Sequence, residues 1–135
     1  MSRRQVFKTR QFSRWMRKTL LTDAALCKAI AEMEQGLVDA DLGGGVVKKR
    51  VALPGRGKSG SARTLLATNK RDRWFFVFGF EKNEQSSISP KELAALQLYA
   101  ADLLKLTTKQ LDAGVAEDRL QEICHDEAQN EEPPT

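Results

Sequence analysis

The sequence predicts an α+β fold, in which helices pack on one face of an antiparallel sheet, the other face stays open, and an additional helix lies near the C-terminus. Three consecutive segments between residues 46 and 80 carry β-branched, aromatic or alternating apolar residues, which are typical of strands. Two other segments, after Thr22 and after Ser89, combine a capping residue with apolar residues at helical spacing. The order of strand, helix, three strands and helices favours an α+β class.

The first part of the chain is predicted to form a strand and a helix. Residues 5–16 begin with a β-branched and aromatic run, which indicates a strand that leads into a turn. Thr22 is suited to cap a helix that has Asp23 in its first turn and Gly36 as its stop. The apolar positions of this helix are Leu26, Ile30, Met33 and Leu37.

A run of three glycines occupies residues 43–45. The three strands predicted after it cover residues 46–53, 62–68 and 74–80, and we expect them to form an antiparallel meander. In the first of these strands, Val47, Val51 and Leu53 fall on one face, and Lys48, Arg50 and Ala52 on the other. In the last strand, alternation places four aromatic residues on one side, which we expect to be the core side. These residues are Trp74, Phe76, Phe78 and Phe80.

Two helices are predicted in the C-terminal third. Residues 89–92 (Ser-Pro-Lys-Glu) form a capping-box pattern with proline at the first helical position. Residues 107–110 repeat the capping pattern, so a further helix is expected over roughly 108–124. We expect residues 1–124 to form a single domain and residues 125–135 to be a disordered acidic tail.

The composition limits the kinds of site and environment. No run approaches the ~20 apolar residues of a membrane span, and the N-terminus lacks the pattern of a signal peptide, so a cytoplasmic protein without membrane contact is expected. Cys27 and Cys124 are far apart in the sequence, and we expect them to be buried thiols without a disulfide. His125 is the one histidine, so no metal site and no cofactor are predicted.

Charge is strongly segregated along the chain. Residues 46–82 hold ten basic residues against two acidic ones, whereas residues 112–135 hold eight acidic residues against Arg119 alone. A basic segment over adjacent strands indicates a nucleic-acid-binding face. The acidic tail could cover this face within the molecule, although a merely solubilising tail is the simpler interpretation.

The loop at residues 55–60 (Gly-Arg-Gly-Lys-Ser-Gly) matches a glycine-rich nucleotide-binding pattern, but its context does not. Such loops open a helix, whereas a strand-like segment follows this one. A flexible basic hairpin fits better, because glycines let the backbone approach a phosphodiester while Arg56 and Lys58 supply charge. A solvated turn is the alternative.

Residues 34–52 (Glu-Gln-Gly-Leu-Val-Asp-Ala-Asp-Leu-Gly-Gly-Gly-Val-Val-Lys-Lys-Arg-Val-Ala) resemble the RelE-like HigB family of type II toxins, and residues 79–84 (Gly-Phe-Glu-Lys-Asn-Glu) support this. The resemblance extends over roughly residues 5–106. It implies the compact RelE/ParE fold and ribosome-dependent mRNA cleavage. It also implies a cognate antitoxin, often a helix-turn-helix protein, through which operator DNA can be bound.

The same resemblance suggests site residues. Arg63 is similar to the phosphate-stabilising arginine of the family, and Lys82 and Lys58 resemble its other basic site residues. The proposed RNA contacts are Lys48, Lys49, Arg50, Arg56 and Arg73, with Phe80 as a stacking residue. The chain departs from many relatives at Ala62, where they carry an aromatic residue that could stack, and it lacks the C-terminal tyrosine of RelE enzymes.

No catalytic triad or carboxylate pair stands out, so the sequence favours a site built from arginine and lysine. The first hypothesis is an mRNA endoribonuclease that inhibits translation. The alternative is a toxin that does not cleave RNA, such as a ParE-like inhibitor of DNA gyrase, or a nucleic-acid-binding regulator on the same fold.

Overall fold

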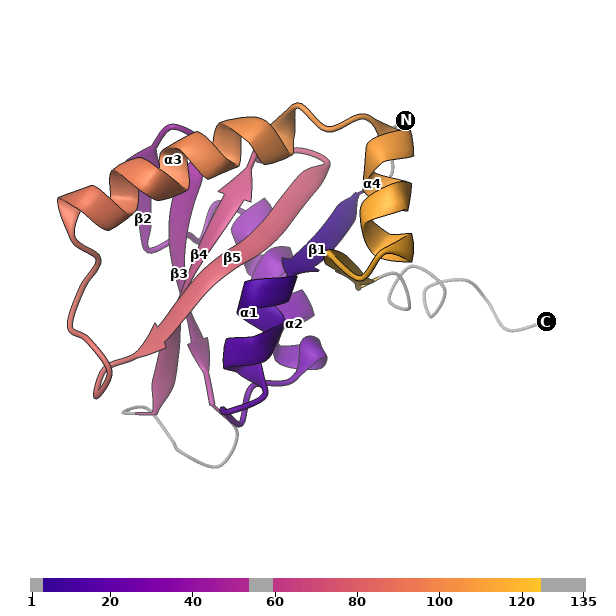
Figure 1. Ribbon diagram of the computed structural model, residues 1–135. Helices are drawn as coiled ribbons and strands as arrows, with labels where there is room; N and C mark the ends of the chain where they lie inside the picture. Colours follow the sequence, from indigo (N-terminus) through magenta and orange to yellow (C-terminus); the bar gives the residue numbers. More distant parts are fainter. Residues whose placement is uncertain (1–3, 54–59, 125–135) are drawn as a thin grey trace.

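The computed structural model describes residues 4–53 and 60–124 of the chain. It contains four helices and six strands in these residues (Figure 1). In chain order they are β1 (Gln5–Thr9), α1 (Arg10–Met16), α2 (Asp23–Glu34), β2 (Ala40–Gly43), β3 (Val46–Ala52), β4 (Ser61–Thr68), β5 (Arg73–Glu81), α3 (Pro90–Leu104), α4 (Thr108–Ala116) and β6 (Leu120–Ile123).

The strands form one sheet in the order β2-β3-β4-β5-β1-β6. All neighbouring strands are antiparallel except β1 and β5, which run parallel. The predicted α+β class and the antiparallel meander of β3, β4 and β5 are confirmed. The two edge strands, β2 and β6, are only four residues long, as is common for edges, which otherwise attract further strands.

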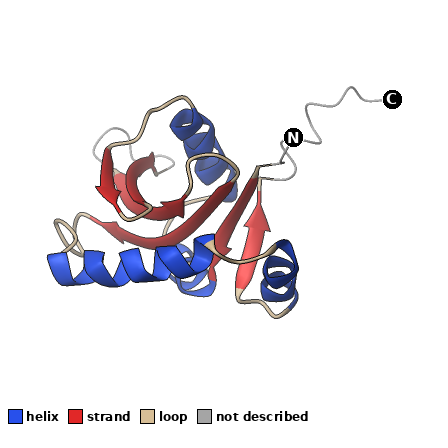
Figure 2. Cartoon of the chain, turned by 90° about the horizontal axis from the view of Figure 1, so that it is seen from above, coloured by secondary structure: helices blue, strands red, loops and turns tan. Residues whose placement is uncertain are grey.

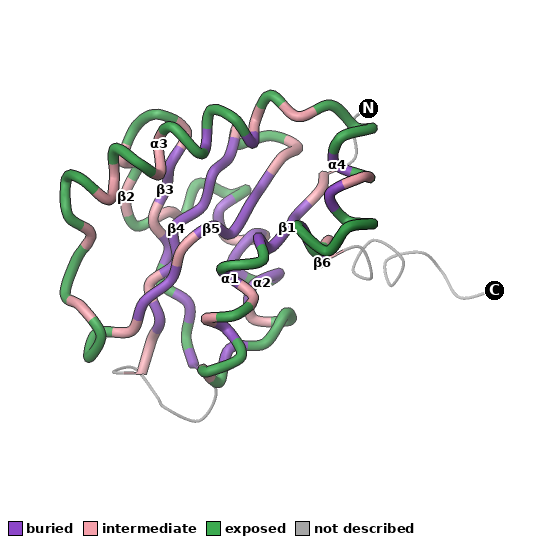
Figure 3. The backbone as a smooth tube through the Cα atoms, in the orientation of Figure 1, coloured by how far each residue is buried: buried purple, intermediate pink, exposed green. Residues whose placement is uncertain are grey.

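Both faces of the sheet carry helices, so the expectation of one covered face and one open face was wrong (Figure 2). One core cluster joins residues of α1 and α2, such as Phe12 and Ile30, to Val47 and Phe76 of the sheet. The other joins Ala100 and Leu103 of α3, among others, to the opposite strand face. Successive strand residues therefore alternate between two cores, and the middle of the sheet is buried (Figure 3).

Capping residues define the helix starts. The side chains of Thr22, Ser89 and Thr107 accept hydrogen bonds from backbone N–H groups in the first turns of α2, α3 and α4. Both predicted capping boxes are present, with Glu92 and Gln110 completing them. These caps satisfy N–H groups that have no partner within a helix.

Three elements differ from the prediction. Residues 10–16 form helix α1 instead of a turn, because Thr9 at the end of β1 also caps a helix. Residues 40–43 form β2, and the glycine run makes its turn to β3 with positive φ at all three positions. The helix predicted over 108–124 ends at Ala116, and Asp118 then has φ of +61°. This reversal lets β6 pair with β1, a long-range contact that helical spacing does not reveal.

Cys27 and Cys124 form a disulfide across 97 residues of sequence, so the expectation of separate thiols was wrong. Cys27 lies on α2 and Cys124 directly follows β6. Because β6 pairs with β1, whose Val6 packs in the same core cluster as α2, the two Cα atoms come within 5.4 Å. That separation is in the usual range for a disulfide.

The glycine-rich loop with Arg56 and Lys58, and the predicted acidic tail, lie outside the described residues. No helix of the described part is long and apolar enough to cross a membrane.

The disulfide predicts that stability depends on redox conditions. Adding a thiol reductant to the oxidised protein should lower its thermal midpoint by on the order of 10 °C, because the cross-link restricts a long loop in the unfolded chain. Thermal melting with and without reductant measures this difference. A Cys27→Ser/Cys124→Ser variant should respond to reductant by less than the wild type does. An unchanged wild-type midpoint would contradict the cross-link.

Candidate nucleic-acid interface

Three cations lie on one face of the sheet, the face that packs against α3. Alternation in β3 places Lys48 and Arg50 on this face, and pairing with β4 adds Arg63 directly opposite Arg50. We call Lys48, Arg50 and Arg63 the basic face. The backbone bonds at Leu53 and Thr68 make Arg50 and Arg63 a non-hydrogen-bonded pair, whose Cα atoms are about 4.5 Å apart in such ladders.

Helix α3 covers only part of this side of the sheet. Its residues Ala100 and Leu103 pack with Val46, Leu65 and Ala67, which lie at the end of the β3–β4 hairpin nearest the glycine turn. Figure 1 shows α3 crossing the strands at this end, while the other ends of β3 and β4 extend beyond it. Arg50, on that extension, keeps 61% of its side chain exposed. The basic face is therefore reachable from solvent.

The charges of the basic face are only weakly compensated. Within the described residues, Lys48 and Arg63 make no hydrogen bond or ion pair through their side chains. Arg50 has one acidic neighbour, Asp39, at 4.0 Å from its Nε atom. Like charges directly opposite each other on neighbouring strands are destabilising. An arginine pair with only this one acidic neighbour is therefore arranged to receive an anion such as a phosphodiester.

A β-bulge in β5 decides which aromatic residues lie beside the basic face. The pairing shifts between Leu65 and Leu66 of β4, so that Val77 of β5 is the extra residue. Beyond it, Phe78 and Phe80 face the same side as Arg63, and their ring centroids are 6.0 Å apart. The prediction that Trp74, Phe76, Phe78 and Phe80 share one side was wrong, since Trp74 and Phe76 belong to the opposite core.

Phe80 pairs with Arg63 across the β4–β5 ladder, but its side chain is only 2% exposed. A nucleobase could therefore stack on this ring only if its neighbours moved. Phe78 is partly buried on the same face. Lys82 is exposed in the turn that follows β5, two residues beyond Phe80, and so lies at the same end of the sheet as Arg63.

Two of the predicted RNA contacts lie elsewhere. Lys49 points to the opposite face, where it is buried, pairs with Glu32 of α2 at 3.0 Å and donates to the Leu37 carbonyl at 2.8 Å. Arg73 begins β5, about 20 Å along the strand from Phe80, and donates to the side chain of Gln5. Lys49 lies on the opposite face because strand side chains alternate, and Arg73 lies far from Arg63 because β5 is long.

Ala62, where the family resemblance suggested an aromatic residue, is fully buried in the core cluster on the α2 side. It therefore faces away from Arg63, and the expectation that its small side chain weakens stacking on RNA was wrong. Asp39, the acidic neighbour of Arg50, was missed in the sequence. Asp39 directly precedes β2, which was not predicted, and the pairing of β2 with β3 is what brings Asp39 beside Arg50.

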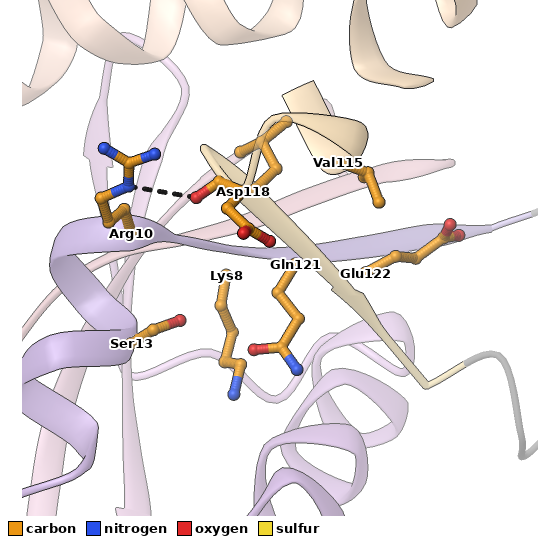
Figure 4. Close-up of a pocket in the computed structure, with 8 residues that line it drawn as sticks. Lys8, Arg10, Ser13, Val115, Asp118, Gln121 and Glu122 are labelled. Carbon is orange, nitrogen blue, oxygen red and sulfur yellow. Dashed lines mark hydrogen bonds between the residues drawn. The ribbon is translucent and has the colours of Figure 1, made fainter. Parts of the chain in front are cut away.

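A cavity of about 510 Å³ lies at the other edge of the sheet, between the start of α1 and the segment from α4 to β6 (Figure 4). Its cations are already engaged. Arg10 donates to the backbone carbonyls of Glu117 and Asp118, and Lys8 donates to Asp23 at 2.7 Å. These bonds tie the N-terminal and C-terminal segments together, so we assign the cavity a structural role.

The groups with shifted pKa values lie outside the basic face. A hydrogen bond from Lys70 lowers the pKa of Asp41, assisted by the Gly43 N–H. The Ser89 N–H lowers the pKa of Glu92 in the capping box of α3, and burial raises the pKa of Tyr99. Among the described residues, no group of three or more His, Cys, Asp or Glu side chains is placed to hold a metal ion.

A family model described as the RelE toxin of the RelE/RelB toxin–antitoxin system matches residues 4–123. The chain belongs to the RelE toxin family. The resemblance noted in the sequence is thereby confirmed at the family level, and this RelE-family protein is the toxin of a toxin–antitoxin pair, with a cognate antitoxin as its partner. A search of curated proteins finds no match.

The basic face predicts an unusual effect of substitution on stability. Arg63→Gln should leave the free energy of unfolding unchanged or raise it by about 0.5 kcal/mol, because it removes repulsion with Arg50. Lys49→Gln, a matched loss of one charge on the neighbouring strand, should lower it by about 1 kcal/mol, because the bonds to Glu32 and Leu37 are lost. Urea denaturation measures both. A larger loss for Arg63→Gln than for Lys49→Gln would make Arg63 a structural residue.

Proposed function

We propose that this toxin is a HigB-like endoribonuclease that cleaves mRNA on the ribosome and so inhibits translation in the cytoplasm. The observation that carries the proposal is the pair of Arg50 and Arg63, which lie opposite each other on an accessible sheet face without a matching set of acids. Such a face attracts the phosphate backbone whatever its sequence.

The proposed chemistry is attack of a ribose 2′-OH on the adjacent phosphorus, with loss of the hydroxyl proton to water and departure of the 5′ oxygen, which takes up a proton from water. Charge builds on the phosphate oxygens in the transition state, and preorganised cations at these oxygens lower the barrier. Arg63 is partly buried, and its strand pairs with β3 on one side and with β5 on the other, so its backbone is held in place at the basic face. Lys82, at the same end of the sheet, is the second proposed source of positive charge.

The remaining cations would hold the RNA. Lys48 and Arg50 extend the charge along β3, and we propose that Arg56 and Lys58 of the glycine-rich loop extend it further. Lys49 and Arg73 are not part of the proposed RNA contact, because Lys49 lies on the opposite face of the sheet and Arg73 lies at the far end of β5. The cognate antitoxin is proposed to be a helix-turn-helix protein through which the pair binds operator DNA.

The proposal predicts growth arrest with new mRNA 5′ ends when the wild type is expressed in a bacterium. Arg63→Gln should reduce cleavage by about a hundredfold, since removing one transition-state donor has such an effect in other enzymes. Sequencing of RNA 5′ ends alongside growth curves measures this. Lys109→Gln, which removes an exposed cation of α4, is the matched control and should cleave normally.

Two outcomes would contradict the proposal. Arrest with DNA damage signalling and without new RNA ends would favour the ParE-like inhibition of gyrase instead. Equal cleavage by wild type and Arg63→Gln would show that the cleavage site does not lie on the basic face.

A further inference from the structure

The turn that carries Lys82 is closed by its own hydrogen bonds. The Glu84 carboxylate accepts from the Glu81 N–H at 2.6 Å, and the Glu84 N–H donates to the Glu81 carbonyl at 2.9 Å. The Gln85 N–H donates to the same carbonyl at 3.3 Å. Lys82 and Asn83 are therefore held between two bonded ends, directly after the last residue of β5.

A second set of contacts fixes this turn to α1. The indole Nε1 of Trp15 donates to the same Glu84 oxygen, at 3.0 Å. Trp15 lies in the last turns of α1, which packs alongside β5. One carboxylate oxygen thus receives a bond from the strand end and another from a helix that lies far away in sequence.

Gly79 allows the indole ring to lie against the strand. A Cβ atom at Gly79 would be 2.3 Å from Cζ3 of Trp15, which is shorter than real contacts allow. The residue is glycine because of this close approach, since its φ is not in the left-handed region. Gly79 immediately precedes Phe80, the partner of Arg63, so the ring is fixed at the end of β5 that carries the proposed site.

We propose that Trp15 and Glu84 are positioning residues, which hold the turn so that Lys82 lies at a fixed place beside Arg63. The inference rests on the proposed function. Glu84 carries a negative charge beside a proposed phosphate site, where it would oppose RNA binding. A positioning role explains why an acid is present there. The two N–H bonds that one carboxylate oxygen of Glu84 accepts explain its presence, because they fix the turn both to the end of β5 and to α1.

This role differs from that of a general base, and the two roles respond differently to substitution. Glu84→Gln keeps a side-chain oxygen that can accept both N–H bonds but removes the basic carboxylate. Glu84→Ala removes both the acceptor and the charge. Trp15→Phe removes the N–H donor and also the outer ring of the indole, which is the part that lies against Gly79.

Single-turnover cleavage of mRNA on programmed ribosomes, with the purified full-length protein, tests the proposal. We expect Lys82→Ala to be slower by at least about a hundredfold, and Glu84→Ala by about tenfold, as small misplacements of catalytic groups cause. Glu84→Gln should stay within about twofold of wild type, and Trp15→Phe should fall between the two Glu84 variants. Thermal midpoints of the Lys82 and Glu84 variants should stay within a few degrees of the wild type, because both residues are exposed.

The decisive comparison adds Glu84→Ala to Lys82→Ala. If Glu84 acts through Lys82, the double variant should cleave no more slowly than Lys82→Ala alone. The inference would be overturned if the double variant cleaved about tenfold more slowly than Lys82→Ala. It would also be overturned if Glu84→Gln were as slow as Glu84→Ala, or if Glu84→Ala were as fast as the wild type. A wild type that leaves mRNA intact would overturn the proposed function and this inference together, whereas the other outcomes overturn only the inference.

Discussion

The register of the β3–β4–β5 ladder is the constraint on which the rest of the structure depends. Because strand side chains alternate strictly, the pairing that places Arg50 opposite Arg63 also sends Lys49 and Ala62 into the opposite core. The bulge at Val77 then adds Phe78 and Phe80 to the arginine side. A slip of one residue in either pairing would bury the arginines and expose the core.

Three helices maintain this register from opposite sides of the sheet. On one side α3 packs only over the glycine-turn end of the hairpin, which leaves the arginine end uncovered. On the other side α2 packs on Val47 and Val51, and α1 places Trp15 against Gly79. The apolar contacts that stabilise the fold and the cations proposed to act on RNA therefore share the same strands, and alternate along them.

Much of this arrangement follows from local sequence patterns. The alternation of Lys48 and Arg50 with Val47 and Val51 predicted a basic strand face, and the capping residues predicted where α2, α3 and α4 begin. The disulfide and β6 were missed for one physical reason, because both depend on contacts between distant segments. The disulfide and β6 both need the pairing of β1 with the end of the domain.

In the candidate site, too, some features follow from local sequence patterns and others do not. The single extra residue of the bulge reverses the faces of Phe78 and Phe80, and no local signal marks it. Likewise, Lys49 stands between two proposed RNA contacts in the sequence, yet its ion pair with Glu32 of α2 lies on the other side of the sheet. Charge counted along a segment indicates a nucleic-acid-binding strand, but register assigns each cation to a face.

The most direct test of this account is site-specific photo-crosslinking to ribosomes that carry mRNA. Ala52 is exposed beside the basic face and Ala24 is exposed on α2, on the other side of the sheet, and neither replacement removes a cation. A photoreactive residue at position 52 should crosslink to RNA, and one at position 24 should do so far less. Equal crosslinking from both positions, or crosslinking from position 24 alone, would contradict the assignment of the RNA-binding face.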